Sequence, residues 1–455
     1  MYAADVGNAY LNAPCREKIW FEAGPEFGED QGTIMVIKKA LYGLKSSGAS
    51  WRAMLAELLV SLKYISSKAD PDVWMRRQTK PNGDQYYEMV LVYVDDILHI
   101  SHDTEPTMKE LGKLYRLKPE SMGEPTRYLG ANIAKYQVDD GSEKWSMSSE
   151  DYVRNAIKNL EILLMEEEAE LNTSKRSTER PYPANYRPEI DVTPLLGPVL
   201  VTRYQNLIGI LRWMVELGRL DIYTEVSMLS SYLCSPRMGH LKAVYSIFAY
   251  LKRHSRSRIV FDDRRVQMDD NLFEEADWTD FYGDIKEELP PNMPEPKGDS
   301  VIMTCYVDAD HAGNLATRRS HTGIIIFLNN TPIQWYSRRQ NTVEASTFGS
   351  EFNALRIAVE MIEALRYKLR MFGIPIDGPT NVFCDNSGVV LNSSRPDSTL
   401  TKKHNSICYH RVREAVAREI IRIAYVGSKS NYADVLTKTT NPMSERRYLL
   451  QDILY

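Results

Sequence analysis

Two aspartates stand side by side inside an apolar stretch of the chain. Asp95 and Asp96 interrupt residues 89–100, MVLVYVDDILHI, whose β-branched and aromatic residues predict the two strands of a hairpin. Burying carboxylates costs on the order of several kcal/mol unless they are paired or bind a metal ion. The pair therefore indicates either a solvent-exposed turn, where adjacent aspartates are common, or a metal site. A third aspartate, Asp5, lies in the string DVGNAYLNA, where a lone acidic residue near a terminus is usually on the surface.

A second group of acidic residues is spread over the last third of the chain. Asp308 ends a predicted strand, Glu351 lies in a predicted helix, Asp385 follows another strand, and Asp434 lies in NYADVLTK. A helix cap would account for Asp385 or Asp434 alone. It does not account for all four at these places, and carboxylate oxygens are the ligands that hard divalent cations prefer. The pattern therefore predicts a second metal site, with Asp310 as the alternative ligand to Asp308.

The elements that must position these residues form a first α/β part and a compact last part. Apolar residues at helical spacing predict a helix over residues 50–63, and residues 200–255 are predicted to be mainly helical. Two polar segments that contain prolines, 166–192 and 267–299, are interpreted as a linker and as an exposed, poorly packed hinge. After the hinge, the order β-β-β-α-β-α-β predicts a mixed five-stranded sheet with flanking helices. Its elements are predicted at residues 301–307, 323–328, 332–336, 344–371, 381–384, 412–419 and 420–426.

The composition is that of an ordinary globular protein. The chain has 455 residues, of which 43% are hydrophobic and 26% charged, so two or three domains with cores of their own are expected. Its net charge of −5 argues against a protein that simply coats nucleic acid, but not against a metal-dependent enzyme with its basic groups in one groove. The start of the chain lacks the pattern of a secretory signal, and no run reaches the about 18 apolar residues of a membrane span. Five scattered cysteines without C-x-x-C spacing favour a reducing, intracellular setting over a disulfide framework or a zinc site.

The first group of carboxylates lies in strings that resemble those of reverse transcriptases. DVGNAYLNA resembles their first metal-binding segment, and YVDD resembles their second. Further strings in the same order resemble copia-type retrotransposons: KKALYGLK at 38–45, ADPDVW at 69–74, YLG at 128–130, YQNLIG at 204–209 and RLDI at 219–222. The resemblance implies that Asp5, Asp95 and Asp96 hold two Mg²⁺ ions, or Mn²⁺ in their place, roughly 3.5–4 Å apart. Tyr10 matches the aromatic position that blocks a ribose 2′-hydroxyl, and a role as a core aromatic residue is equally open.

The last part of the chain resembles the ribonuclease H of copia-type elements. The strings that carry this resemblance are RRSHTG at 318–323, QWYS at 334–337 and YHRVRE at 409–414. It implies that Asp308, Glu351, Asp385 and Asp434 hold two metal ions that cleave the RNA strand of an RNA–DNA hybrid. Several basic residues could contact the phosphate backbone or form an ordinary solvated surface. They are Arg318, Arg319, Arg338, Arg339, Lys402 and Lys403.

The resemblance as a whole predicts a fragment of a copia-type Pol polyprotein. Residues 1–165 are expected to form an α+β reverse transcriptase palm whose preceding fingers segment is missing, 166–290 a thumb or connection with linkers, and 298–445 a ribonuclease H-like domain. The implied activities are RNA-directed DNA synthesis, weakened by the missing fingers, and RNA cleavage. The implied partners are an RNA template, a DNA primer, their hybrid, dNTP and the integrase and protease segments of the polyprotein, but no membrane. The implied location is cytoplasmic, in a virus-like particle, with nuclear entry also open. The alternatives are a decayed or co-opted element that binds nucleic acid without catalysis, and a stand-alone ribonuclease H.

Overall fold

The computed structural model describes the chain except for residues 167, 169, 175–177, 184, 401–404 and 440–442, so Lys402 and Lys403 lie outside the described residues. The described residues form two compact units. The first unit consists of Met1–Leu129, Pro290–Asp299 and Lys368–Pro375, and the second of Gly130–Leu289, Ser300–Tyr367 and Ile376–Tyr455. Residues 1–129 are the longest continuous part of the first unit, and residues 130–165 belong to the second. No described helix combines the length and the apolar composition that crossing a membrane requires.

The first unit is built on a five-stranded sheet in the order β1-β7-β6-β5-β4, in which every neighbouring pair is antiparallel. The predicted hairpin is confirmed as β6 (Gln85–Tyr93) and β7 (Asp96–Ile100), which lie in the middle of the sheet. The other elements of this unit are β1 (Tyr2–Asp5), α1 (Ala9–Asn12), β2 (Trp20–Glu22), β3 (Ile34–Val36), α2 (Ser47–Ser61), β4 (Ile65–Ser66), β5 (Val73–Thr79), α3 (Glu105–Leu114) and β8 (Arg127–Tyr128).

Helix α2 is the predicted helix of residues 50–63, and it begins three residues earlier than predicted. It buries Trp51, Leu55 and Leu59, which lie on one face because they are four residues apart. These side chains form one apolar core with residues of the sheet and of α3, among them Met108. The sheet and the helices of the first unit are thus held together by ordinary hydrophobic packing.

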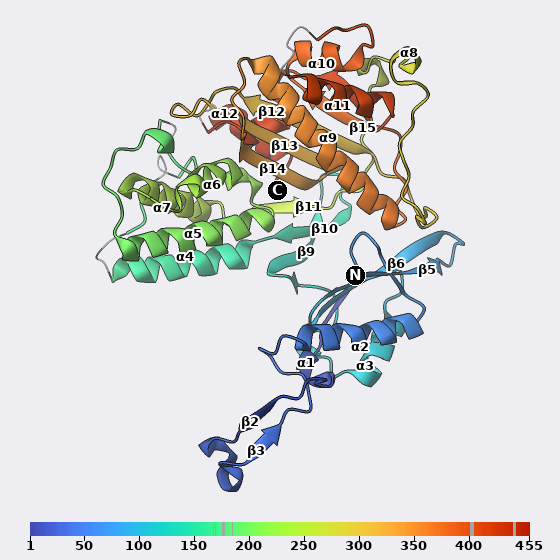
Figure 1. Cartoon of the computed structure of the whole chain (residues 1–455), viewed down its shortest axis with the longest axis vertical. Helices are drawn as coiled ribbons and strands as arrows, with labels where there is room; N and C mark the ends of the chain where they lie inside the picture. The colour runs from blue at the N-terminus through green and yellow to red at the C-terminus, as the bar shows by residue number, and fades with distance from the viewer. Residues whose placement is uncertain (167, 169, 175–177, 184, 401–404, 440–442) are drawn as a thin grey trace. The chain divides into compact units, whose positions relative to one another are not determined.

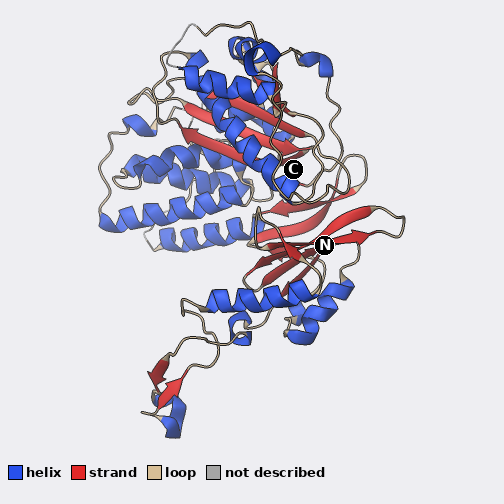
Figure 2. Ribbon diagram, turned by 45° about the vertical axis from the view of Figure 1, so that its right-hand side comes forward, coloured by secondary structure: helices blue, strands red, loops and turns tan. Residues whose placement is uncertain are grey.

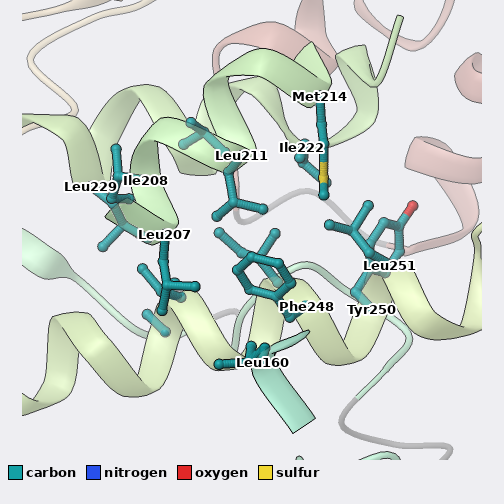
Figure 3. Close-up of a cluster of buried hydrophobic side chains, with 14 of the residues drawn as sticks. Leu160, Leu207, Ile208, Leu211, Met214, Ile222, Leu229, Phe248, Tyr250 and Leu251 are labelled. Carbon is teal, nitrogen blue, oxygen red and sulfur yellow. The ribbon is translucent and has the colours of Figure 1, made fainter. Parts of the chain in front are cut away.

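The helical part of the second unit forms an apolar core of its own (Figure 3). Leu160, Leu211 and Phe248 come from three different helices, point into the same interior and are at most 3% exposed. The prediction that residues 200–255 are mainly helical is confirmed. The helices are α4 (Glu150–Met165), α5 (Pro198–Glu216), α6 (Tyr223–Leu229) and α7 (Met238–Arg253).

The mixed sheet of the second unit has the order β14-β13-β12-β15-β16. Its first three strands are antiparallel and its last two run parallel to β12, so the predicted mixed five-stranded sheet is confirmed. The helix α9 crosses the strands diagonally in both views (Figures 1 and 2). The strands of this sheet and the helices of the same part of the chain are β12 (Met303–Asp310), β13 (His321–Leu328), β14 (Thr331–Arg339), α9 (Thr347–Met371), β15 (Thr380–Cys384), α10 (Ser387–Ser394), α11 (Ser406–Ala417), β16 (Ile421–Tyr425) and α12 (Met443–Gln451).

The two segments interpreted as a linker and a hinge are better packed than predicted. In the segment 166–192, Tyr182 is 2% exposed and belongs to the core of the helical part. In the segment 267–299, Phe273 and Trp278 are buried, and the guanidinium of Arg413 lies 4.8 Å from the Trp278 ring centroid. The prediction of a poorly packed hinge is therefore wrong for these residues, because a few aromatic side chains anchor an otherwise polar segment.

Some elements of the second unit have no counterpart in the prediction. Three strands pair antiparallel in the order β11-β10-β9, and the pairing of β10 with β11 joins residues more than one hundred positions apart in the sequence. The helices α10 and α12 were not predicted either. The strands are β9 (Ala131–Gln137), β10 (Glu143–Ser148) and β11 (Arg258–Val260).

Candidate active sites

The tip of the β6–β7 hairpin presents the first two predicted carboxylates. Val94 and Asp95 connect the strands, and Val94 has a φ of 58°, in the left-handed region that β-branched residues rarely adopt. The Nε1 of Trp51 donates a 2.6 Å hydrogen bond to the carbonyl of Val94. A buried residue of α2 therefore holds a strained turn in place, as is common at functional sites.

The strand β1 brings Asp5 to this tip. Asp5 is the direct partner of Asp96 in the antiparallel β1–β7 ladder, and the N–H of Val6 donates a 2.9 Å hydrogen bond to the carbonyl of Asp95. Direct partners in such a ladder have Cα atoms about 4.5–5.5 Å apart. The backbone thus gathers all three predicted residues, although Asp5 and Asp95 lie far apart in the sequence. Among the described residues, the carboxylate oxygens of these three side chains do not all lie within 4.8 Å of one another.

The charges at the tip are only partly balanced. Lys118 Nζ lies 2.7 Å from Asp5 Oδ2, whereas Asp5 Oδ1 is buried and has no hydrogen-bond partner among the described residues. Partial burial, followed by the charges of Asp95 and Asp5, raises the pKa of Asp96. Lys118 and Arg127 both act on Asp96, so two basic side chains face three carboxylates and the group stays net negative, which is the electrostatic setting that a divalent cation relieves.

Tyr10 lies in α1, on the same side of the first unit as the acidic tip. Its ring centroid is 4.5 Å from that of Tyr42, which belongs to the KKALYGLK string. Desolvation, and then the negative charge of Asp95, raises the pKa of Tyr42. Tyr10 is half-buried and also packs against the apolar core of this unit. Its predicted contact with a ribose stays a prediction.

The second predicted site is built where β12 meets the turn that carries Asp434. Asp308 lies in β12 opposite Gly323 of β13, and it is 1% exposed. The buried side chain of Asn431 donates a 2.9 Å hydrogen bond to the Val307 carbonyl and accepts one from the N–H of Ala433. Asn431 therefore fixes the turn of residues 432–436, with Asp434 inside it, against the strand of Asp308.

Two further predicted residues converge on the same place from other elements. Glu351 lies in the second turn of α9 and is 3% exposed, and Asp385 directly follows β15. Their oxygens and the Sγ of Cys384 all lie within 4.8 Å of one another. Burial and the charge of Glu351 raise the pKa of Cys384 well above its usual range, so the thiol is neutral. Cys384 is therefore a neighbour of the proposed carboxylate ligands, because hard cations such as Mg²⁺ prefer oxygen ligands to sulfur.

The carboxylates of this site repel one another. Burial, followed by the charges of Asp308 and Asp385, raises the pKa of Glu351 well above its usual range. Burial and the charge of Asp308 likewise raise the pKa of Asp385. Glu351 Oε2 is buried and has no hydrogen-bond partner among the described residues. An unsatisfied buried oxygen in an acidic cluster is costly unless a cation compensates it.

Two residues that the sequence analysis did not single out neutralise part of this charge. Thr437 donates a hydrogen bond to Asp308 Oδ2, and the ammonium of Lys438 forms ion pairs with both Asp308 and Asp434. Burial alone would lower the pKa of Lys438, but the charges of Asp308 and Asp434 raise it. Both residues lie in the NYADVLTK string that contains the predicted Asp434, but the sequence did not indicate that they contact Asp308.

Asp310, the alternative ligand, lies at the end of β12 on the same face as Asp308. Burial, opposed by Lys438 and reinforced by Asp308, raises the pKa of Asp310 to about 6. Asp310 also lines a cavity of about 470 Å³ within the second unit. Five arginines line it too, and none of them is ion-paired with a carboxylate among the described residues. They are Arg187, Arg212, Arg319, Arg338 and Arg339.

Both acidic groups fit divalent cations. Each is made of oxygen ligands, which Mg²⁺ and Mn²⁺ prefer, and each contains one buried carboxylate oxygen without a hydrogen-bond partner among the described residues. These oxygens belong to Asp5 and Glu351. In the first unit the structure places Asp5 opposite Asp96, which follows Asp95 in the chain. In the second unit it places Glu351 and Asp385 close together, with Asp308 and Asp434 beside them on Lys438.

One protein family and several transposon polyproteins have sequences similar to this chain. Residues 1–169 match the protein family described as Reverse transcriptase (RNA-dependent DNA polymerase). Over 95% of its length the chain is 25% identical to the Retrovirus-related Pol polyprotein from transposon RE1 of Arabidopsis thaliana, of which it spans 26%. It is also 25% identical over 95% of its length to the Retrovirus-related Pol polyprotein from transposon TNT 1-94 of Nicotiana tabacum, of which it spans 29%.

Among solved structures, the N-terminal RNase H domain of rv2228c from Mycobacterium tuberculosis, a fusion with maltose binding protein, matches 33% of this chain and 98% of that chain. The identity is 15% and the TM-score 0.24, too low to support a conclusion. By sequence, the chain is therefore similar over 95% of its length to transposon Pol polyproteins, of which it spans 26–29%, and its residues 1–169 match the reverse transcriptase family.

Proposed function

We propose that the chain combines an RNA-directed DNA polymerase with a ribonuclease H, each with its own carboxylate site. In the first unit, Asp5, Asp95 and Asp96 would hold the cations that serve nucleotide addition to a DNA primer on an RNA template. In the second unit, Asp308, Glu351, Asp385 and Asp434 would hold those that serve cleavage of the RNA strand of an RNA–DNA hybrid. The single observation that carries this proposal is the buried, unpartnered oxygen of Glu351 amid repelling carboxylates.

The cation we propose is Mg²⁺, two ions per site, with Mn²⁺ as a substitute. When bound, such ions stabilise the charge that develops on phosphate oxygens and lower the pKa of a bound water or hydroxyl. The protein's own part is to hold the carboxylates in place: the Val94 turn and the β1–β7 ladder do so in the first unit, and Asn431 does so in the second.

The cavity lined by five arginines supports a nucleic-acid substrate for the second unit. Arginines without carboxylate partners are suited to phosphate oxygens, which they contact through paired N–H groups. Tyr186 and Tyr336 also line the cavity and offer flat surfaces for sugars or bases. The cavity reaches Asp310, next to Asp308, so a strand held there would lie beside the proposed cleavage site.

The remaining partners and the location follow from the kinship with Pol polyproteins. We propose RNA template, DNA primer, RNA–DNA hybrid and dNTP as ligands, and integrase and protease segments of a parent polyprotein as neighbours. We propose an intracellular, cytoplasmic place of action in a virus-like particle, with later entry into the nucleus.

The test is a pair of assays on the 455-residue chain with Mg²⁺: cleavage of a labelled RNA–DNA hybrid, and extension of a DNA primer on an RNA template. Asp385→Asn should abolish cleavage and leave any extension as in the wild type, because a neutral amide cannot hold a divalent cation beside a phosphate that gains charge. Asp95→Asn should abolish any extension and leave cleavage as in the wild type. Cleavage that survives Asp385→Asn but is lost in Asp95→Asn would contradict the assignment of the sites. A folded wild-type chain that binds the hybrid without either reaction would favour the co-opted, non-catalytic alternative.

A further inference from the structure

The ammonium of Lys438 sits between two of the carboxylates proposed as metal ligands. Its Nζ lies 3.3 Å from Asp308 Oδ2 and forms an ion pair with Asp434 Oδ1. The lysine side chain is 29% exposed, whereas those of Asp308 and Asp434 are 2% and 10% exposed. The carboxylates are therefore fixed in the interior, and the lysine reaches them from the solvent side.

Because of this contact, the negative charge of the acidic site is balanced at Asp308 and Asp434 more than at Glu351 and Asp385. Asp308 Oδ2 already accepts a hydrogen bond from Thr437 in addition to the contact with Lys438. On the other side of the site, neither Glu351 nor Asp385 is ion-paired with a basic side chain among the described residues, and Glu351 Oε2 lacks any hydrogen-bond partner there. Asp308 and Asp434 thus have the ammonium of Lys438 beside them, whereas Glu351 and Asp385 have no such partner among the described residues.

A lysine is suited to a contact that must be given up. Its ammonium is a compact point charge on a flexible stem with four carbons, so it can leave by rotating about single bonds. Lys438 follows the 432–436 turn between two buried residues, Thr437 and Thr439, and its own side chain keeps 29% of its surface exposed. A divalent cation bound to the same two carboxylates would lie close to the ammonium of Lys438 and repel it, because both carry positive charge.

We propose that Lys438 is a built-in counter-ion that competes with a divalent cation for Asp308 and Asp434, so that Glu351 and Asp385 bind the first cation and Lys438 must swing out before the second binds. The inference rests on the proposed ribonuclease H function and deepens it. It makes Lys438 a positioning residue that keeps the metal-free site folded and sets its metal affinity. A different role, in which Lys438 contacts the substrate phosphate and leaves metal affinity unchanged, is an outcome of the test.

The experiment measures Mn²⁺ binding by electron paramagnetic resonance of free Mn²⁺, without nucleic acid. The full chain carries Asp5→Asn and Asp95→Asn, so that the first unit contributes no binding. Lys438→Met is compared with Lys438→Arg, which keeps the charge, and with Lys429→Met, an exposed lysine of the same part of the fold. Lys438→Met should bind the second Mn²⁺ roughly fivefold more tightly or better, since removing a competing ligand removes an unfavourable coupling. Lys438→Arg and Lys429→Met should bind like the parent.

A thermal melt keeps the test independent of activity. Without metal, Lys438→Met should melt at a lower temperature than the parent, because four crowded carboxylates lose their counter-ion. With saturating Mn²⁺ the difference should close. Unchanged or weaker Mn²⁺ binding by a folded Lys438→Met chain would overturn the proposal that Lys438 is a competing counter-ion. If the KM for the RNA–DNA hybrid also rises in that variant, Lys438 contacts the substrate instead. If neither the parent nor the variant binds Mn²⁺, both this inference and the proposed metal-dependent function fail. That outcome differs from Mn²⁺ binding that Lys438→Met leaves unchanged, which contradicts the counter-ion inference alone.

Discussion

A Cβ atom on Gly323 would lie 2.6 Å from the backbone oxygen of Ala433, so β13 and the turn that carries Asp434 approach each other only because residue 323 has no side chain. Gly323→Ala should therefore push the turn away from Asp308. We expect the free energy of unfolding of the second unit to fall by about 1–3 kcal/mol, as for other overpacked interiors. Urea denaturation followed by circular dichroism measures this loss.

Gly209→Ala is the matched control for this substitution. Gly209 lies in α5 of the same unit, and an added Cβ there meets nothing within 4 Å. Alanine is the better helix former, so this change should raise stability by up to about 1 kcal/mol. Equal destabilisation by the two substitutions would show that the contact between Gly323 and the turn has no special weight.

Glu351→Gln should make the metal-free protein more stable while removing its response to metal. The carboxylate is buried, faces the charges of Asp308 and Asp385, and has a raised pKa for these reasons. A neutral amide of the same shape removes that repulsion, and we expect a gain of about 1 kcal/mol in EDTA. The melting temperature should no longer rise when Mn²⁺ is added. Glu360→Gln, on the exposed side of the same helix, should change neither quantity.

The stability of the second unit should depend on pH through His321. This side chain is 5% exposed beside Ser337, and burial lowers its pKa to about 3. The unfolded chain binds a proton near the ordinary histidine pKa of about 6.5, whereas the folded chain does not, so stability is lost as pH falls below that value. Between pH 6.5 and 5 the loss should be about 1.5 kcal/mol larger in the wild type than in His321→Gln. Parallel pH profiles of the two proteins in urea denaturation would refute this account.

Hybrid binding should depend on salt through the arginines of the cavity. If Arg212 and Arg319 contact phosphates, each alanine substitution should weaken binding to any hybrid sequence and reduce the slope of log K against log salt by about 1. Fluorescence anisotropy at several salt concentrations measures the slope. Arg154→Ala, which removes an exposed arginine paired with Glu150 in α4, should leave the slope as it is. A wild-type slope in the cavity variants would place the nucleic acid elsewhere.

The sequence was most informative where a local pattern of residues had only one structural interpretation. Apolar periodicity identified α2 and the β6–β7 hairpin, and the β-β-β-α-β-α-β order led to the mixed sheet with its four acidic residues. It was least informative about β9, β10 and β11, because pairing between residues 146 and 260 depends on long-range contacts that local patterns do not encode. The packed hinge was missed for a related reason: Phe273 and Trp278 are isolated in a polar segment, and burial depends on the partners that meet them.

The direct pairing of Asp5 with Asp96 makes the first site sensitive to the register of a single short strand. Because side chains alternate between the two faces of a strand, a slip of one residue would place Ala4 opposite Asp96 and turn the Asp5 carboxylate to the other face. A change that shifts the whole of β1 by one residue along β7 therefore differs in kind from a substitution within β1. The apolar core of the first unit lies almost entirely outside β1 and would remain after the slip, but Asp5 would no longer be the direct partner of Asp96.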